Sequence, residues 1–183
     1  MERCVAFLRA VNVGGHATVG MDALKQAFYR AGCSDVRTFL QSGNVIFDHP
    51  ATDRNAALLD IQVALDELLG FKVVVIFRSS IEIENIVRST PFSAREARDD
   101  VKFYVTFLSQ IPNAGLDLPL VSAKDAIEII DIQNAEVYVV SALKKNGMYG
   151  FPNDFIEKRF GIPATTRNWS TVTKIAARLG SLN

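Results

Sequence analysis

The chain has 183 residues, and its 49% hydrophobic content is enough for one good core or two small ones. No apolar run approaches the ~20 residues of a membrane span, and the opening residues lack the order of a signal peptide, so we expect a cytoplasmic protein with no membrane partner. Lys and Arg together number 20, and Asp and Glu together also number 20, so the net charge is zero. This balance of charge argues against a nucleic-acid binder.

A glycine-rich loop joins the first predicted strand to the first predicted helix. Residues 3 to 10 are apolar at successive positions, which predicts a central strand covered on both faces. After the loop, apolar residues recur at helical spacing, and Gly32 follows where a left-handed cap is expected. We therefore predict a helix from about residue 21 to residue 31.

A hairpin follows, with predicted strands at 36–41 and 44–48. Ser42 and Gly43 lie between them and have the chemistry of a tight two-residue turn. The two strands are therefore expected to be antiparallel.

Another helix and strand complete this half of the chain. Thr52 or Asp53 can cap the helix, and Gly70 can close it. Residues 73–77 are mostly β-branched, which predicts a buried strand. The resulting order over residues 1–78, β-α-β-β-α-β, is that of a ferredoxin-like unit.

Residues 79–100 are predicted to link this lobe to a second one. Ser79 and Glu82 have the spacing of a capping box, which predicts a short helix that ends by Pro91. The polar and charged residues 92–100 predict an exposed linker.

Residues 101–183 are predicted to repeat the same order in a second lobe with a C-terminal helix. Strands are expected at 102–108, 126–130, 136–140 and 165–168, and helices within 112–122, at 152–160 and after the cap residue Asn168 or Ser170. The predicted fold class is therefore α+β, with two ferredoxin-like lobes in tandem, packed through their apolar sheet faces. Dimerisation would cover the same faces equally well, so the oligomeric state stays open.

Cysteine and histidine do not form a recognisable metal site. Cys4 and Cys33 are too few and too far apart for a zinc site, and both are predicted to be buried thiols. His16 and His49 lack a partner at a catalytic or metal-binding spacing. We predict no metal, and the sequence identifies no cofactor and no catalytic residue.

Three separated segments resemble one known family. Residues 5–15, 36–47 and 166–172 are similar, in order, to an uncharacterised bacterial family known as domain of unknown function 1697. The likeness spans nearly the whole chain. It supports the boundaries given above and implies no reaction or ligand.

The principal candidate site is the rim where the glycine-rich loop meets the hairpin turn. Gly14 and Gly15 can expose backbone N–H groups before the positive end of a helix, a combination that suits an anion. In a β-α-β-β-α-β unit the exit of the first strand and the turn of the hairpin lie at the same end of the sheet. The predicted ligand-binding residues are Arg9, Asn12, Gly14, Gly15, Gln41, Ser42 and Asn44.

A purely structural interpretation of the same residues stays open. The glycines can simply let the chain turn from strand to helix. Gln41 and Asn44 can equally satisfy the backbone of the hairpin and loop, as most such side chains do.

The second candidate site precedes the last helix and consists of Arg167, Asn168, Trp169, Thr171 and Lys174. The tryptophan could stack on a ring or a base while the two cations meet an anion near the helix N-terminus. In the alternative interpretation, Asn168 caps the helix and Trp169 fills an interface between the lobes.

Three functional hypotheses follow. The first is a module that binds a small anionic metabolite or nucleotide at the rim. The second is an enzyme of unknown reaction that uses Arg9 and His16 in a cleft between the lobes. The third is a nucleic-acid module, which the topology permits, although residues 44–47 lack the aromatic pattern that stacks bases and the net charge is zero.

Overall fold

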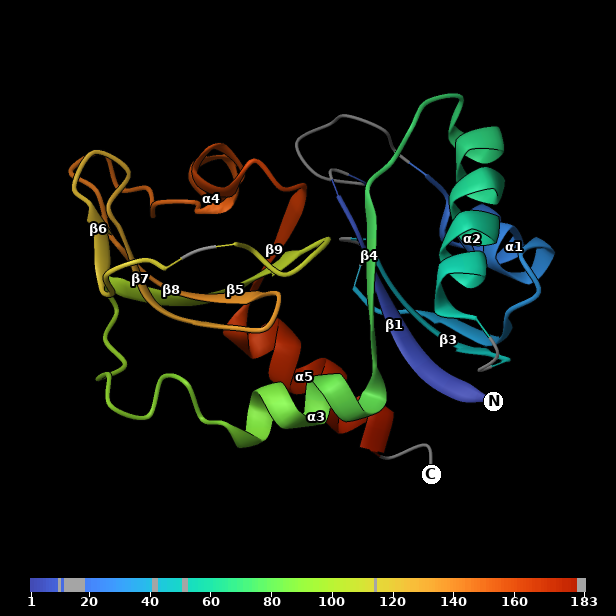
Figure 1. Ribbon diagram of the computed structural model, residues 1–183, viewed down its shortest axis with the longest axis horizontal. Coiled ribbons are helices and arrows are strands. Elements are labelled where there is room, and N and C mark those ends of the chain that lie inside the picture. The colour runs from blue at the N-terminus through green and yellow to red at the C-terminus, as the bar shows by residue number, and fades with distance from the viewer. Residues whose placement is uncertain (10, 12–18, 41–42, 51–52, 114, 181–183) are drawn as a thin grey trace. The chain divides into compact units, whose positions relative to one another are not determined.

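The structure is a computed structural model that describes residues 1–9, 11, 19–40, 43–50, 53–113 and 115–180. Within these residues the chain forms two antiparallel sheets and helices α1 to α5, an α+β architecture (Figure 1). It divides into two units, Met1–Glu84 with Ile175–Asn183, and Asn85–Lys174. The boundaries expected from the sequence stay predictions, as does the packing of the lobes through their sheets.

The sheet of the first unit has the strand order β2-β3-β1-β4. Its elements are β1 (Glu2–Leu8), α1 (Met21–Arg30), β2 (Ser34–Thr38), β3 (Asn44–His49), α2 (Arg54–Leu69) and β4 (Val75–Ser79). The element order and the strand order are both those of a split βαβ unit. Val5 and Cys4, neighbours whose side chains point to opposite faces of the sheet, are both buried, which confirms that β1 is covered on both sides.

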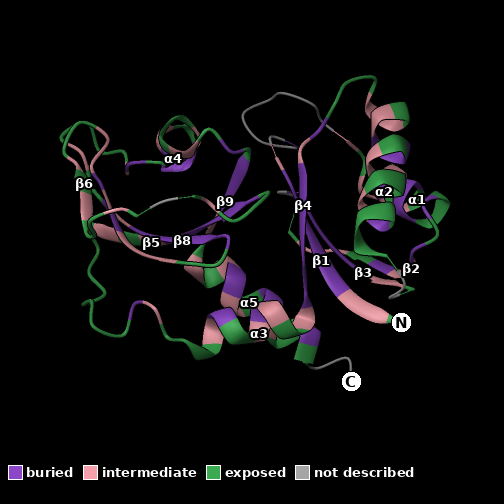
Figure 2. Ribbon diagram, in the orientation of Figure 1, coloured by how far each residue is buried: buried purple, intermediate pink, exposed green. Residues whose placement is uncertain are grey.

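One face of this sheet packs against α1 and α2 (Figures 1 and 2). At its centre the Phe47 ring lies 5.2 Å from the Phe28 ring and 5.9 Å from the Phe77 ring. Cys4 and Cys33 belong to this core, and burial raises the pKa of each thiol to about 12. The prediction that both cysteines are buried thiols is therefore confirmed.

The predicted helix ends of this unit are confirmed by their hydrogen bonds. Asp53 accepts bonds from Asn55 N at 2.9 Å and Ala56 N at 3.2 Å, and Gly70 ends α2 with φ 74°. The helix α3 (Ser80–Arg88) begins with the expected capping box. Ser79 N donates to a Glu82 carboxylate oxygen at 2.7 Å, and Glu82 N donates to Ser79 Oγ at 3.2 Å.

The predicted two-residue hairpin turn is wrong. β2 ends at Thr38, and Phe39 N donates to Asn44 O at 2.9 Å, so the connection spans residues 40–43. Leu40 has φ 55° and Gly43 has φ 68°. A positive φ at a leucine has no signal in the sequence, which is why the spacing of Ser42 and Gly43 misled the prediction.

One backbone carbonyl at the sheet edge formed by β4 accepts two charged donors. Arg54 Nη2 and Arg78 Nη1 donate to Phe77 O at 2.7 and 3.0 Å. The Arg54 guanidinium also lies 4.9 Å from the centre of the Phe77 ring and forms an ion pair with Glu82. Arg54 thus connects α2 to β4 and to the start of α3.

The sheet of the second unit has the strand order β6-β7-β8-β5-β9. Its elements are β5 (Val101–Leu108), β6 (Leu120–Ser122), β7 (Ile127–Gln133), β8 (Glu136–Ala142), α4 (Asn153–Phe160) and β9 (Ala164–Asn168), followed by α5 (Trp169–Gly180). α4 packs on one face of this sheet. Strands were predicted on either side of Asn134, and they are present as β7 and β8. Asn134 lies in the turn between them with φ 53°, a conformation that asparagine tolerates better than most residues.

The predicted helix within 112–122 does not occur among the described residues of that segment. The short strand β6 occupies its end and pairs with β7. Pro112, Gly115 and Pro119 interrupt any helical pattern there. The second unit therefore lacks the first crossover helix of a β-α-β-β-α-β order, although β7-β8-β5-β9 matches the strand order of the first unit. In the described part of the chain, no helix is both long and apolar enough to cross a membrane.

Candidate functional site

The frame of the predicted rim is held together by backbone hydrogen bonds. Phe7 pairs with Asn44 across β1 and β3, and Leu8 N donates to Gly43 O at 2.8 Å. On the other side of the strand, Arg9 N donates to Val74 O at 3.0 Å. The end of β1 therefore lies between the hairpin turn and the residues that lead into β4.

Gly43 is required at its position by conformation and by space. Its φ of 68° is a left-handed conformation that other residues rarely adopt. A Cβ atom there would lie 3.1 Å from both Leu8 Cβ and Leu8 O. The glycine lets the hairpin approach β1 closely, a structural reason for its presence that needs no ligand.

Asn44 serves the hairpin itself. Its side chain is buried, with 1% exposure, and its Nδ2 donates to Phe39 O at 3.0 Å. This contact agrees with the structural interpretation of Asn44. Arg9 is half-buried at the end of β1. The other predicted rim residues, Asn12, Gly14, Gly15, Gln41 and Ser42, lie outside the described residues, as does His16.

The second candidate site lies entirely in described residues. Arg167 Nη1 donates to Thr165 Oγ1 at 2.8 Å and to Thr166 O at 2.9 Å. Burial lowers the pKa of its guanidinium to about 10, so the group keeps its charge at neutral pH. Lys174 and Asn168 are exposed, whereas Thr171 is half-buried.

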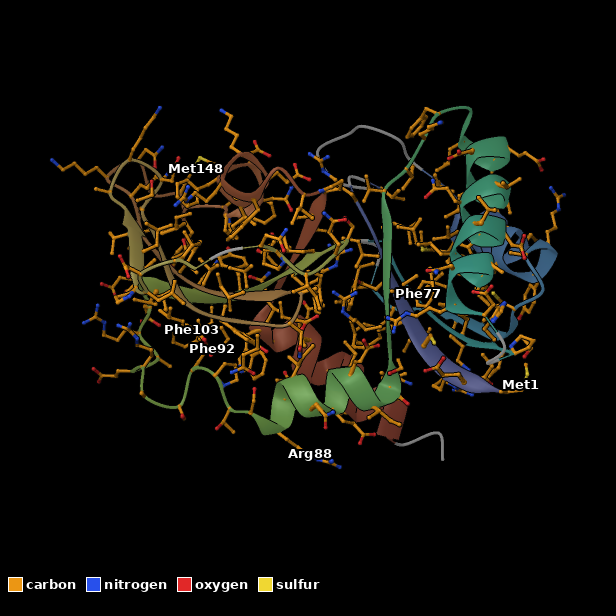
Figure 3. The ribbon with its side chains drawn as sticks, viewed as in Figure 1. Met1, Phe77, Arg88, Phe92, Phe103 and Met148 are labelled. Atoms are coloured by element: carbon orange, nitrogen blue, oxygen red, sulfur yellow. The ribbon has the colours of Figure 1, made fainter. Side chains whose placement is uncertain are left out.

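Trp169 is packed against other aromatic rings of the second unit. Its ring centre lies 5.2 Å from that of Phe92, edge to face. Phe92 in turn stacks on Phe103 (Figure 3), with ring centres 4.7 Å apart. The ring centre of Tyr138 lies 6.0 Å from that of Phe92. One neighbour of the tryptophan is therefore a core side chain, which favours a packing role for it over a ligand platform.

The prediction that residues 92–100 form an exposed linker is wrong at Phe92, which is buried. Phe92 is 6% exposed, although most residues after it in the segment are exposed. The single aromatic side chain after Pro91, in an otherwise polar segment, was the signal that could have identified it.

Sequence reasoning did not predict a cavity at the end of α4. The cavity has a volume of about 380 Å³ and lies between the segment after β5 and the last residues of α4. Gln110, Asn113 and Arg159 contribute polar groups, and Phe160 and Ile162 contribute apolar surface. A guanidinium with two carboxamides suits a small molecule that carries a carboxylate or phosphate.

The described residues offer no obvious metal centre. No group of three or more His, Cys, Asp or Glu side chains that could hold a metal ion occurs among them.

Comparisons with known proteins relate the chain to one family and one fold. Residues 1–138 match the model of the family described as "Protein of unknown function (DUF1697)", a range that includes the rim and ends before the second candidate site. No curated protein matches the chain. The structure of the conserved bacterial protein SP0830 from Streptococcus pneumoniae is similar over 97% of this chain and 98% of that one, with a TM-score of 0.63 and 20% identity. At that identity the likeness shows a shared fold.

Proposed function

We propose a function for this chain, which belongs to the DUF1697 family of proteins of unknown function. The first unit binds a small anionic ligand, a cytoplasmic metabolite or nucleotide, at the rim formed by the 9–15 loop and the 41–44 hairpin. The observation that carries this proposal is the hydrogen bond from Leu8 N to Gly43 O. It fixes the exit of β1 beside the hairpin turn, so Arg9 and the turn lie at the same end of the sheet.

The chemistry of recognition rests on Arg9 and on backbone donors. A guanidinium can pair with two oxygen atoms of a carboxylate or phosphate at once. Gly14 and Gly15 precede α1, whose N-terminal end favours negative charge. Asn44 holds the turn through Phe39 O, so its part in this proposal is to shape the rim.

A thermal-shift screen of the full chain tests the proposal. The panel contains nucleoside phosphates, sugar phosphates and dicarboxylates. A ligand at 100 times its dissociation constant adds about 2.7 kcal/mol to the free energy of unfolding, which raises the melting temperature by several degrees. Arg9→Ala is expected to abolish this shift. Arg30→Ala, an exposed arginine at the end of α1, is the matched control and should retain it.

The cavity at the end of α4 supports a second candidate function, anion binding by the second unit. Its lining combines Arg159 with Gln110 and Asn113 around a volume of about 380 Å³. The same panel separates the two candidates, because Arg159→Ala would abolish a shift that arises in the cavity and leave one that arises at the rim. The absence of any shift with wild-type protein would contradict both.

A further inference from the structure

The outward face of α2 combines apolar and acidic side chains. Leu59 and Val63 lie one turn apart and are 63% and 50% exposed. Asp60 and Glu67 are also exposed, and their spacing puts them on the same helical face. We call Leu59, Asp60, Val63 and Glu67 the α2 face. Two adjacent, large aliphatic side chains in solvent mark a surface suited to contact.

A second exposed apolar surface lies on the connection between β8 and α4, residues 143–151. Leu143, Met148 and Phe151 are 44%, 65% and 60% exposed. Figure 3 labels Met148. Lys144 and Lys145 lie between the first two, and the segment contains no acidic residue. We call this segment the 143–151 hairpin.

Backbone hydrogen bonds hold the 143–151 hairpin in a defined conformation. Leu143 pairs with Tyr149, and Lys144 N donates to Met148 O at 2.8 Å. Gly147 N donates to Lys144 O at 2.9 Å, and Ser141 Oγ donates to Gly150 O at 2.7 Å. The segment is thus ordered while its apolar side chains remain in water. Such an arrangement leaves apolar surface to be covered by a binding partner.

We propose that the α2 face of one molecule binds the 143–151 hairpin of a second copy of the chain. Each surface offers apolar side chains to the other, and the charges beside them are opposite: Asp60 and Glu67 on the α2 face, Lys144 and Lys145 on the hairpin. The contact joins two different surfaces, so it propagates head to tail. Both surfaces are small, so the association is weak and depends on concentration and salt.

Sedimentation velocity of the full chain tests this proposal. The weight-average sedimentation coefficient of the wild type is expected to rise with concentration into the high micromolar range, and to rise less at high salt. Asp60→Lys/Glu67→Lys and Lys144→Glu/Lys145→Glu should each weaken the association more than about tenfold, because like charges then meet. The protein with all four substitutions should associate again, since the charges are complementary once more.

A matched control reverses two exposed cations outside both surfaces, Arg30→Glu/Lys158→Glu, and should associate as the wild type does. Thermal melts confirm that each variant is folded. A wild type that stays monomeric at every concentration overturns the proposal. The proposal is also overturned if both double variants associate as strongly as the wild type. It is overturned as well if the protein with all four substitutions stays monomeric. These outcomes are independent of ligand binding at the rim.

Discussion

Gly150 has no room for a side chain. A Cβ atom there would lie 2.1 Å from Asp125 O and 2.8 Å from Ile127 Cγ2, so the backbone would have to move. Gly150→Ala is expected to lower the free energy of unfolding by about 3 kcal/mol, at the upper end of the usual cost of overpacking. Urea denaturation measures the change. Gly115→Ala is the control, because a Cβ atom at that position would have no other atom within 4 Å, and equal effects of the two substitutions would contradict the prediction.

Glu82 makes stability depend on pH in the acid range. Burial raises the pKa of its carboxyl group, but hydrogen bonds from Arg54 and from Ser79 N outweigh this effect, and the pKa lies below its ordinary value of 4.5. The unfolded chain therefore binds the proton more readily. The contribution of Glu82 to stability is complete above pH 4.5 and is lost as pH falls through its folded-state pKa.

Glu82→Gln should accordingly flatten the acid side of the stability curve. We expect the variant to be less stable than the wild type at neutral pH, and the difference to shrink as the pH falls below 4.5. Urea denaturation midpoints across this pH range measure the effect. A difference that stays constant with pH would show that the carboxylate charge has no part in the capping box.

At the scale of the element, α2 depends on its N-cap. Asp53 accepts hydrogen bonds from two backbone N–H groups of the first turn, so Asp53→Ala leaves both without that partner. The expected loss in the free energy of unfolding is about 1 kcal/mol. Asp53→Asn keeps an accepting oxygen and should cost much less. Similar losses in the two variants, measured by chemical denaturation, would assign the effect to charge instead of capping.

Helix ends were predictable because their determinants are local. A few neighbouring residues identified the capping box of Ser79 and Glu82, the cap residue Gly70, and Asp53 as one of two candidate N-caps, and their bonds are present. The length of the hairpin connection was not predictable, because it depends on a leucine that adopts a positive φ, a conformation that no feature of the sequence signals.

In the candidate sites, too, some features could be predicted from the sequence, and others depend on contacts between distant segments. The meeting of the first strand with the hairpin turn followed from topology, and the Leu8 to Gly43 hydrogen bond agrees with it. The burial of Phe92 and the cavity beside Arg159 arise from packing between segments far apart in sequence. No periodicity in the chain encodes such contacts, so the sequence could not predict them.

At the scale of the whole molecule, the two units are connected by two continuous helices. The division between units falls within α3, after Glu84, and within α5, after Lys174. In the portion of α5 that belongs to the first unit, Ile175 and Leu179 are buried, with 0% and 1% exposure. Because each unit contains part of α3 and part of α5, unfolding of one unit is expected to destabilise the portion of these helices that belongs to the other.

We accordingly expect a single cooperative unfolding transition. Differential scanning calorimetry should give one peak whose calorimetric enthalpy equals the van't Hoff enthalpy. Leu179→Ala should lower the free energy of unfolding by about 2 to 5 kcal/mol and shift the whole peak. Two resolved peaks, or a variant that shifts only part of the signal, would show that the units unfold independently.

The two arginines on the Phe77 carbonyl also bear on aggregation. β4 forms one edge of its sheet, and an unprotected edge strand can pair with strands of other molecules. An incoming strand would first have to uncover β4, whose five residues are all buried, and would then have to displace Arg54 and Arg78 from this carbonyl. An interaction that joins α2 to β4 within the fold thus also obstructs edge-to-edge strand pairing between molecules.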